Sequence, residues 1–229
     1  MTKRIVIAID GPAGAGKSTI ARAIARRLGF VYIDTGAMYR AVALWALRTG
    51  VSESDMHRLE QLATAADISF VPGSNSVLLN GEDVTEIIRT PEVAAFASKI
   101  STVGAVRRAL VEKQRKMAAE ASVVMEGRDI GSVVFPDAQV KIFLDADPSI
   151  RTDRRVRELS QSGASADRTA TAEEIGERDR RDRTRNESPM VQAPDAVYLD
   201  TSGLSLEEVE EAILKLVRER TSNGKEYSR

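Results

Sequence analysis

Residues 11–18 read Gly-Pro-Ala-Gly-Ala-Gly-Lys-Ser, which fits the phosphate-binding loop pattern G-x-x-x-x-G-K-S. The sequence on both sides has the patterns that such a loop requires. Ile5 to Ile9 is a short apolar run rich in β-branched residues, which predicts a buried strand. Thr19 to Leu28 predicts a helix, because its apolar residues recur at the spacing of one helical face. Strand, loop and helix together predict a site for a nucleoside triphosphate.

The chemistry of the loop follows from its residue types. Its glycines allow the backbone to curl so that successive N–H groups point into one hollow, and the dipole of the following helix adds positive potential there. Lys17 can reach the β- and γ-phosphates, and the Ser18 hydroxyl can bind Mg²⁺. We therefore expect ATP with Mg²⁺, and Ser18 as the metal ligand. The residues expected to bind ATP in this segment are Gly11, Pro12, Ala13, Gly14, Ala15, Gly16, Lys17, Ser18 and Thr19.

The composition narrows the class of protein. The chain has 229 residues, no cysteine and a single histidine, His57. Disulfides, zinc–thiolate sites, thiol catalysis and histidine-based triads are therefore excluded. The formal net charge of -1 gives no general attraction to nucleic acid or to a membrane surface, and no segment is apolar over a membrane-spanning length. We expect a cytoplasmic monomer with small-molecule partners, no nucleic acid and no membrane.

Short apolar runs alternate with helical patterns along most of the chain. This alternation predicts an α/β fold of the P-loop NTPase type, with a parallel sheet of about five strands and helices on both sides. The expected strands are residues 5–9, 30–33, 122–125, 140–144 and 196–199. In such sheets the ligand lies beyond the carboxyl ends of the strands. The unusual polar segments follow three of these strands, at Gly11–Ser18, Asp34–Arg40 and Glu126–Asp129.

A different pattern interrupts this alternation at about residues 67–101. Asn80-Gly81 is a strong hairpin-turn signal inside it, and a helix is expected from Pro91 with Thr90 as its cap. The expected strands of this small antiparallel insert are residues 68–71, 77–79 and 82–85. The single domain is thus divided into a core of about residues 1–66, 102–150 and 186–220, the insert at 67–101, and a helical lid at about 151–168.

The remaining helices are expected from apolar periodicity and cap residues. Asp147-Pro148 opens a helix that runs to about Ser160, and Ser205 with Glu208 forms a capping box for the last helix. Ser162 to Ala170 is rich in small polar residues, which predicts a mobile loop. The other expected helices are residues 36–48, 52–65, 105–120 and 172–185.

Two charged segments follow the expected strand ends. Arg40 lies about one helical turn beyond Gly36, where a guanidinium can grip a phosphate with two N–H groups; the alternative is a surface arginine. Arg128 and Asp129 are adjacent charges suited to a polar ring and a phosphate; the alternative is a turn with a local ion pair. The carboxylates that end two strands, at positions 34 and 126, could hold waters on Mg²⁺.

A third charged cluster lies at residues 178–185. On a helix, Arg178, Asp182 and Arg185 share one face. A similar stripe (Arg151, Arg154 and Arg155) precedes the expected mobile loop. Charge runs are usually solvated surfaces, but so many like charges repel one another unless an anion lies among them. Two arginine-bearing helices beside a mobile loop predict a lid that closes over phosphates.

Together these motifs resemble the bacterial cytidylate kinases (CMP/dCMP kinases) of the nucleoside monophosphate kinase group. The resemblance covers nearly the whole chain and rests on residues 10–18, 34–40, 126–138, 140–145 and 177–183, with the insert. It implies ATP- and Mg²⁺-dependent phosphoryl transfer to CMP and dCMP, which gives CDP or dCDP and ADP.

The resemblance also implies roles for individual residues. The base would lie against Thr35, Arg128 and Asp129. The residues implied to bind CMP are Thr35, Arg40, Ser98, Arg107, Arg128, Asp129, Arg178, Asp182 and Arg185, while Arg154 is implied to bind ATP. The catalytic residues would be Lys17, Arg128, Arg178 and Arg185, which neutralise the charge of the transferred phosphoryl group. Glu126 stands where Asp is frequent in the family and is one methylene longer.

Two other functions stay open from the sequence. One is a different small-molecule P-loop kinase, acting on UMP, AMP or shikimate; the insert and the Glu-Gly-Arg-Asp segment argue against it. The other is a P-loop switch protein that binds nucleotide and signals to a partner. The chain has no guanine-selective N-K-x-D sequence, and its arginines suit a second phosphate ligand.

Overall fold

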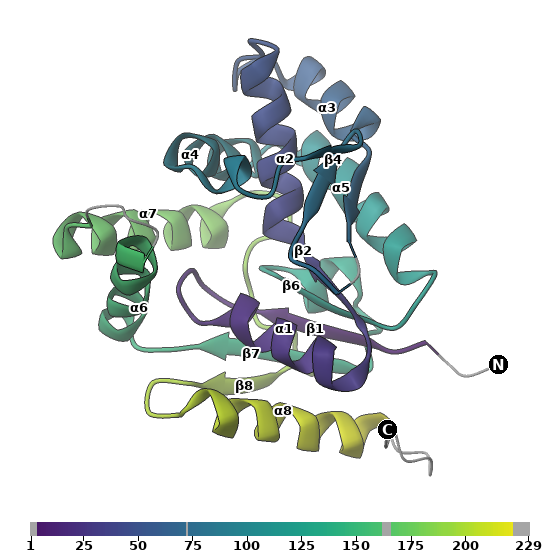
Figure 1. Cartoon of the computed structure of the whole chain (residues 1–229), viewed down its shortest axis with the longest axis vertical. Coiled ribbons are helices and arrows are strands. Elements are labelled where there is room, and N and C mark those ends of the chain that lie inside the picture. The colour runs from purple at the N-terminus through teal and green to yellow at the C-terminus, as the bar shows by residue number, and fades with distance from the viewer. Residues whose placement is uncertain (1–3, 72, 162–165, 222–229) are drawn as a thin grey trace.

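The computed structural model describes residues 4–71, 73–161 and 166–221 and centres on a five-stranded sheet. The strand order is β2-β6-β1-β7-β8, and all four neighbouring pairs are parallel (Figure 1). The strands are β2 (Val31–Asp34), β6 (Val123–Gly127), β1 (Val6–Asp10), β7 (Val140–Asp145) and β8 (Val197–Asp200). The parallel sheet expected from the sequence is confirmed.

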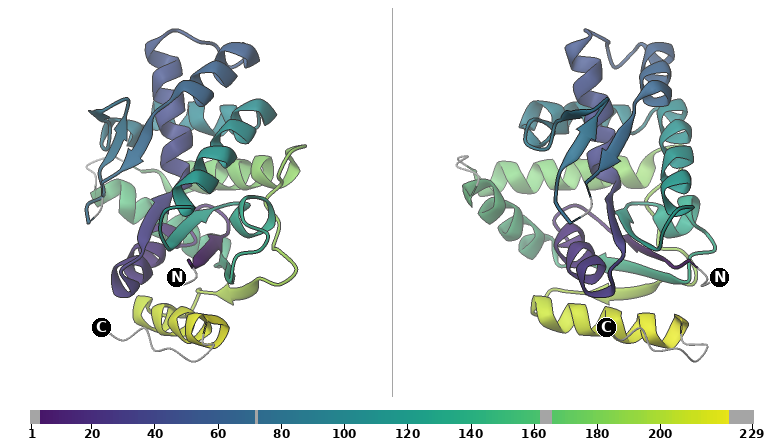
Figure 2. Two further views of the ribbon diagram at one scale, coloured as in Figure 1. Left: turned by 90° about the vertical axis from the view of Figure 1, so that its right-hand side faces the viewer. Right: turned by 45° about the vertical axis from the view of Figure 1, so that its right-hand side comes forward.

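Helices cover both faces of this sheet (Figure 2). One hydrophobic cluster joins the sheet to α1 (Lys17–Leu28) and α8 (Leu206–Thr221). The other joins it to α2 (Thr35–Arg48), α3 (Met56–Ala65) and α5 (Gly104–Ala118). Because successive side chains of a strand point to opposite faces, a strand covered on both sides is apolar throughout. This explains the continuous apolar runs at residues 6–9 of β1 and 123–125 of β6.

The antiparallel insert is confirmed as a three-stranded sheet. It consists of β3 (Ile68–Phe70), β4 (Val77–Leu79) and β5 (Glu82–Asp83). Asn80 (φ 51°) and Gly81 (φ 82°) both adopt the left-handed conformation that a two-residue hairpin favours. The last strand is shorter than expected, because Thr85 bonds back to the Asp83 carboxylate through its hydroxyl (2.6 Å) and its amide (2.9 Å), which turns the chain.

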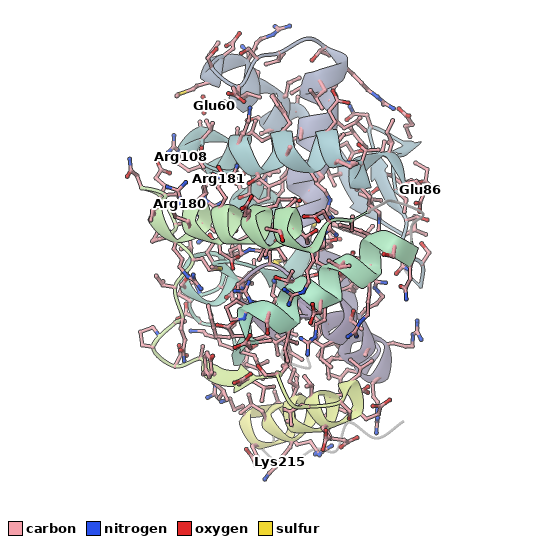
Figure 3. The ribbon with its side chains drawn as sticks, turned by 90° about the vertical axis from the view of Figure 1, so that its left-hand side faces the viewer. Glu60, Glu86, Arg108, Arg180, Arg181 and Lys215 are labelled. Carbon is pink, nitrogen blue, oxygen red and sulfur yellow. The ribbon has the colours of Figure 1, made fainter. Side chains whose placement is uncertain are left out.

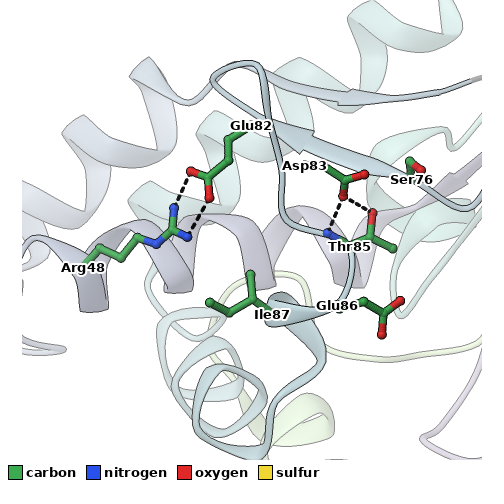
Figure 4. Close-up of a pocket in the computed structure, with 7 residues that line it drawn as sticks. All are labelled: Arg48, Ser76, Glu82, Asp83, Thr85, Glu86 and Ile87. Carbon is green, nitrogen blue, oxygen red and sulfur yellow. Dashed lines mark hydrogen bonds and ion pairs between the residues drawn. The ribbon is translucent and has the colours of Figure 1, made fainter.

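A short 3₁₀ helix, η1 (Ile87–Arg89), leads from the insert sheet into α4 (Pro91–Ile100). Thr90 occupies the N-cap position and Pro91 opens the helix, as expected, but the Thr90 side chain makes no cap hydrogen bond. Its hydroxyl donates instead to the Ile87 carbonyl (3.0 Å). The insert packs into the same hydrophobic cluster as α2, and Arg48 on α2 binds Glu82 through two hydrogen bonds beside a surface hollow of about 580 Å³ (Figure 4).

Helices α6 (Pro148–Gln161) and α7 (Arg168–Thr184) pack against each other beyond the carboxyl end of β7 (Figure 1). Helix α7 begins four residues before the expected position, because the Asp167 carboxylate accepts from the Ala170 amide (2.8 Å) and caps it. The expected loop is therefore wrong at residues 168–170, and its residues 162–165 lie outside the described chain. Helix α3 likewise begins at Met56, after a capping Asp55, and not at Ser52.

Three further observations complete the fold. Ser205 and Glu208 form the expected capping box, with reciprocal hydrogen bonds of 2.8 and 3.2 Å. A π-helical turn at Ile130–Val134 was not expected; such turns often mark functional sites. Within the part of the chain that the structure describes, no helix combines the length and apolar character that crossing a bilayer requires.

Candidate functional site

The glycine-rich loop connects β1 to α1 at the carboxyl edge of the sheet. Gly14 (φ 75°) and Gly16 (φ 92°) are left-handed, which turns the backbone around a hollow in front of α1. The Lys17 side chain is buried in this hollow, and its ammonium donates to the Pro12 carbonyl (2.6 Å). Burial, followed by the nearby Arg128, lowers the pKa of Lys17 to about 7. An anionic phosphate in the loop would favour the charged ammonium again.

Helices α6 and α7 grip the loop through a buried ion pair. The Asp179 carboxylate accepts from the Ala13 amide (3.0 Å) and pairs with the Arg151 guanidinium (2.5 Å). Arg151 also donates to the Ala13 carbonyl (2.9 Å). A Cβ at Gly14 would lie only 2.9 Å from the Arg151 carbonyl oxygen, so glycine is required for this close approach. The two helices that carry the arginine clusters are thus fixed to the phosphate-binding loop.

Arg154 lies on the same side of the loop. Its guanidinium donates to the Ala15 carbonyl (3.2 Å) and to the hydroxyl (3.0 Å) and carbonyl (2.8 Å) of Thr201, which follows β8. The structure therefore places Arg154 beside the expected ATP site. Thr19, also expected there, is exposed on the first turn of α1.

A chain of alternating charges runs from α5 to α7. Arg107 on α5 pairs with Asp129 (2.5 Å), and Asp129 pairs with Arg185 (3.2 Å). Arg185 reaches Asp182 (3.5 Å), and Asp182 binds Arg128 (2.9 Å). All five were expected at the CMP site, and the structure brings them together. Each buried charge here has an opposite charge beside it, which offsets the cost of removing it from water.

Arg178 is different from its neighbours. Among the described residues, no hydrogen bond or ion pair holds its guanidinium. Burial, together with the positive charges of Arg128 and Arg40, lowers the pKa of Arg178 to about 10. Arg180, in contrast, is exposed on the outer side of the same helix (Figure 3). Arg178, Arg128 and Lys17 therefore form a positively charged region that a bound anion would neutralise.

Carboxylates lie at the opposite edge of this region. Asp34 ends β2 beside Glu126 at the end of β6. Burial, followed by the negative charge of Asp34, raises the pKa of Glu126. The Arg40 guanidinium (3.0 Å) and the Ala37 amide (2.8 Å) donate hydrogen bonds to the Asp34 carboxylate. Burial by itself would raise the pKa of Asp34, but these partners outweigh it and keep the pKa below its usual range. The Ser18 hydroxyl is among the groups that stabilise the Glu126 carboxylate. These hard oxygen donors fit Mg²⁺, which takes one or two carboxylates together with water and phosphate oxygens.

Comparison with known proteins identifies the family. The cytidylate kinase family model matches residues 7–219. The chain belongs to the cytidylate kinase family. It is 62% identical to a cytidylate kinase of Solibacter usitatus, over 99% of this chain and 97% of that protein. A cytidylate kinase of Pelotomaculum thermopropionicum is 51% identical, over 96% of both chains. An uncharacterized protein of Eubacterium ventriosum shares the fold, with a TM-score of 0.55 and 14% identity, over 95% of this chain and 100% of that one.

The other residues implied by the cytidylate kinase resemblance have mixed surroundings. The Thr35 hydroxyl donates to the Glu126 carbonyl (2.6 Å) and so ties the start of α2 to β6. Ser98 on α4 is buried, and its hydroxyl has no hydrogen-bond partner among the described residues. The Nε atoms of Arg40 and Arg107 are also buried without a partner. Unpaired buried donors are costly, so these three groups are the ones a polar ligand would satisfy.

Sequence reasoning missed the buried Asp10. This carboxylate precedes the glycine-rich loop and accepts from the amides of Ile130 and Gly131 (both 2.7 Å), directly after Arg128 and Asp129. It therefore links the loop to the turn that carries Arg128 and Asp129, which were expected at the CMP site. Asp179 was also missed, and Arg151 was expected in the lid but not as a partner of the glycine-rich loop. Asp10 and Asp179 both stand in the motifs that carry the family resemblance, which is the signal that could have found them.

The pH dependence of stability tests the burial of Asp10. Burial raises its pKa from 3.8 to about 7 despite the two amides. The folded chain thus binds the Asp10 proton more tightly than the unfolded chain does. The stability that this proton contributes is lost as the pH rises from about 4 to 7. Asp10→Asn resembles the protonated carboxyl and cannot ionise. Between pH 5 and 7.5, urea unfolding should show the wild type losing on the order of 2 kcal/mol more stability than the variant. Equal losses would contradict this account.

The unpaired charge of Arg178 predicts a gain of stability when it is removed. Arg178→Gln should raise the free energy of unfolding by about 1 kcal/mol, because it relieves repulsion from Arg128 and Arg40. Sulfate should stabilise the wild type more than this variant, since an anion supplies the same relief. Arg180→Gln, on the outer side of α7, is the matched control and should change neither property. A loss of stability in Arg178→Gln, with unchanged sulfate dependence, would show that this charge is already balanced.

Proposed function

We propose that this chain catalyses ATP- and Mg²⁺-dependent phosphoryl transfer to CMP and dCMP, which gives CDP or dCDP and ADP. The observation that carries the proposal is the position of Arg128. It belongs to the charged chain expected at the acceptor site, yet it lies close enough to Lys17 in the glycine-rich loop to lower the pKa of that lysine. The residues proposed to bind the donor phosphates and those proposed to bind the acceptor phosphate are therefore neighbours, as direct transfer between two nucleotides requires.

The donor nucleotide is assigned to residues 11–19 and Arg154. The acceptor nucleotide is assigned to Thr35, Arg40, Ser98, Arg107, Arg128, Asp129, Arg178, Asp182 and Arg185. The acidic members of this acceptor set, Asp129 and Asp182, bind arginines of the same set. A bound base and sugar would donate hydrogen bonds to these carboxylates. The phosphate would accept hydrogen bonds from the arginine N–H groups that have no partner.

The chemistry requires positioning and charge neutralisation. The transition state spreads negative charge over the phosphoryl oxygens, which Lys17, Arg128, Arg178 and Arg185 would stabilise. The acceptor oxygen belongs to an ionised phosphate, so no residue has to remove a proton. Ser18 and the carboxylates at positions 34 and 126 would hold Mg²⁺, directly or through water, and the metal would neutralise charge on the β- and γ-phosphates.

The domain division is part of the same proposal. The core, the monophosphate-binding insert at about 67–101 and the lid at about 151–168 would move relative to one another during the reaction. Arg151 and Arg154 fix the first turns of α6 to the glycine-rich loop, so lid motion would involve residues beyond them. We place the enzyme in the cytoplasm and expect a monomer, which light scattering would test.

ADP release from ATP and Mg²⁺ tests the proposed reaction. CMP and dCMP should stimulate it strongly, whereas UMP, AMP, shikimate or no acceptor should stimulate it much less. Lys17→Ala should lower the CMP-dependent rate by about 100-fold or more, because it removes a charge that stabilises the transition state. Lys215→Ala, on the exposed face of α8 (Figure 3), is the matched control. ADP release that no monophosphate stimulates would contradict the acceptor assignment. A normal rate in Lys17→Ala would contradict the assignment of the loop to ATP.

A further inference from the structure

The Glu126 carboxylate is held by a tyrosine that the proposed reaction does not use. Glu126 ends β6 and is buried (4% exposed). Tyr32, on the neighbouring β2, donates its hydroxyl to Glu126 Oε1 (2.6 Å). The parallel register pairs Tyr32 with Val124 and Asp34 with Glu126, so the tyrosine reaches along the sheet to the end of the next strand.

The surroundings of Tyr32 fix its hydroxyl as a donor. The Arg22 guanidinium on α1 lies 5.4 Å from the centre of the tyrosine ring, which is within the range of a cation–π contact. A carboxylate oxygen can only accept a hydrogen bond, so the Tyr32 hydroxyl is the donor in its bond to Glu126 (2.6 Å).

The two neighbouring carboxylates have different partners. Asp34 is turned toward Arg40 and the Ala37 amide, which bind both of its oxygens. Glu126 has no arginine or lysine within ion-pair distance among the described residues. Tyr32 donates a hydrogen bond to it (2.6 Å), and the Ser18 hydroxyl is near enough to favour its charged form. Glu126 is thus the less neutralised carboxylate, and it lies near Ser18, which stands in the first turn of α1 and is assigned to the metal.

A glutamate needs such support more than an aspartate would. Its side chain has one more rotatable bond, and ordering a long side chain costs conformational entropy. The Tyr32 hydroxyl removes part of this freedom by fixing Oε1 before any ligand binds. Partners that orient a metal-binding carboxylate in this way commonly change metal affinity by about 10- to 100-fold.

We propose that Tyr32 is a positioning residue that aims the Glu126 carboxylate at the Mg²⁺ bound with ATP next to Ser18. This inference rests on the proposed function for the identity of the metal and the nucleotide. Tyr32 itself touches neither. It acts through Glu126, so its contribution should vanish when the glutamate can no longer bind metal.

Calorimetric titration of the full chain with ATP, with and without Mg²⁺, tests this inference independently of turnover. In Tyr32→Phe, ATP affinity without Mg²⁺ should stay unchanged, while the gain in affinity that Mg²⁺ confers should fall by about 10-fold. The Mg²⁺ concentration for half-maximal activity should rise by a similar factor. Tyr198→Phe removes a hydroxyl from an exposed tyrosine on β8 and is the matched control.

A double-mutant cycle separates positioning from a general structural effect. In a Glu126→Gln background, which lacks the negative charge, Tyr32→Phe should cause little further loss of the Mg²⁺ effect. The inference is overturned if Tyr32→Phe leaves the Mg²⁺ effect intact, if it weakens ATP binding equally with and without Mg²⁺, or if its effect persists in the Glu126→Gln background. Failure of the wild type to bind ATP at all would instead overturn the proposed function, and this inference with it.

Discussion

The site depends on positive charge that the protein leaves without a full set of counterions. Arg128 and Arg178 both lie close enough to lower the pKa of Lys17, and Arg128 also lowers that of Arg178, because like charges in a buried region repel strongly. Folding offsets part of this cost with Asp129 and Asp182, which pair with Arg107, Arg128 and Arg185. The remainder is a region that binds anions, and it lies where the glycine-rich loop meets α7.

The parallel sheet makes this arrangement possible. Because β1 lies between β6 and β7, the glycine-rich loop, the turn after β6 and the start of α6 all leave the same edge. Asp10 joins the first two of these segments, and the Asp179–Arg151 pair joins the loop to α6 and α7. Buried hydrogen bonds to charged groups are directional and strong, so the residues proposed for the donor and those proposed for the acceptor are fixed relative to one another by the same few carboxylates.

The residue patterns predicted the parts of the structure that local physics determines. The glycine-rich loop, the five parallel strands, the Asn80-Gly81 hairpin and the Ser205 capping box all follow from short-range rules. The family resemblance, and not the residue patterns alone, supplied the proposed acceptor-site residues, five of which the fold brings together from α5, the turn after β6, and the end of α7. The strand order, the π-helical turn at Ile130–Val134 and the bonds made by Asp10, Tyr32 and Asp179 were not predicted. Each depends on a partner distant in sequence, and a single carboxylate or hydroxyl in a motif does not reveal which backbone or side chain it will meet. The early start of α7 was a local error, since Asp167 is an ordinary cap residue that was read as part of a loop.

The most direct test of this account is calorimetric binding of CMP and of cytidine to the wild-type chain, each at low and high salt. If unpaired arginine charge drives acceptor binding, CMP should bind at least about 100-fold more tightly than cytidine, and only the CMP affinity should fall as salt rises. Equal affinities for CMP and cytidine, or a CMP affinity independent of salt, would contradict the central role of the arginine charge.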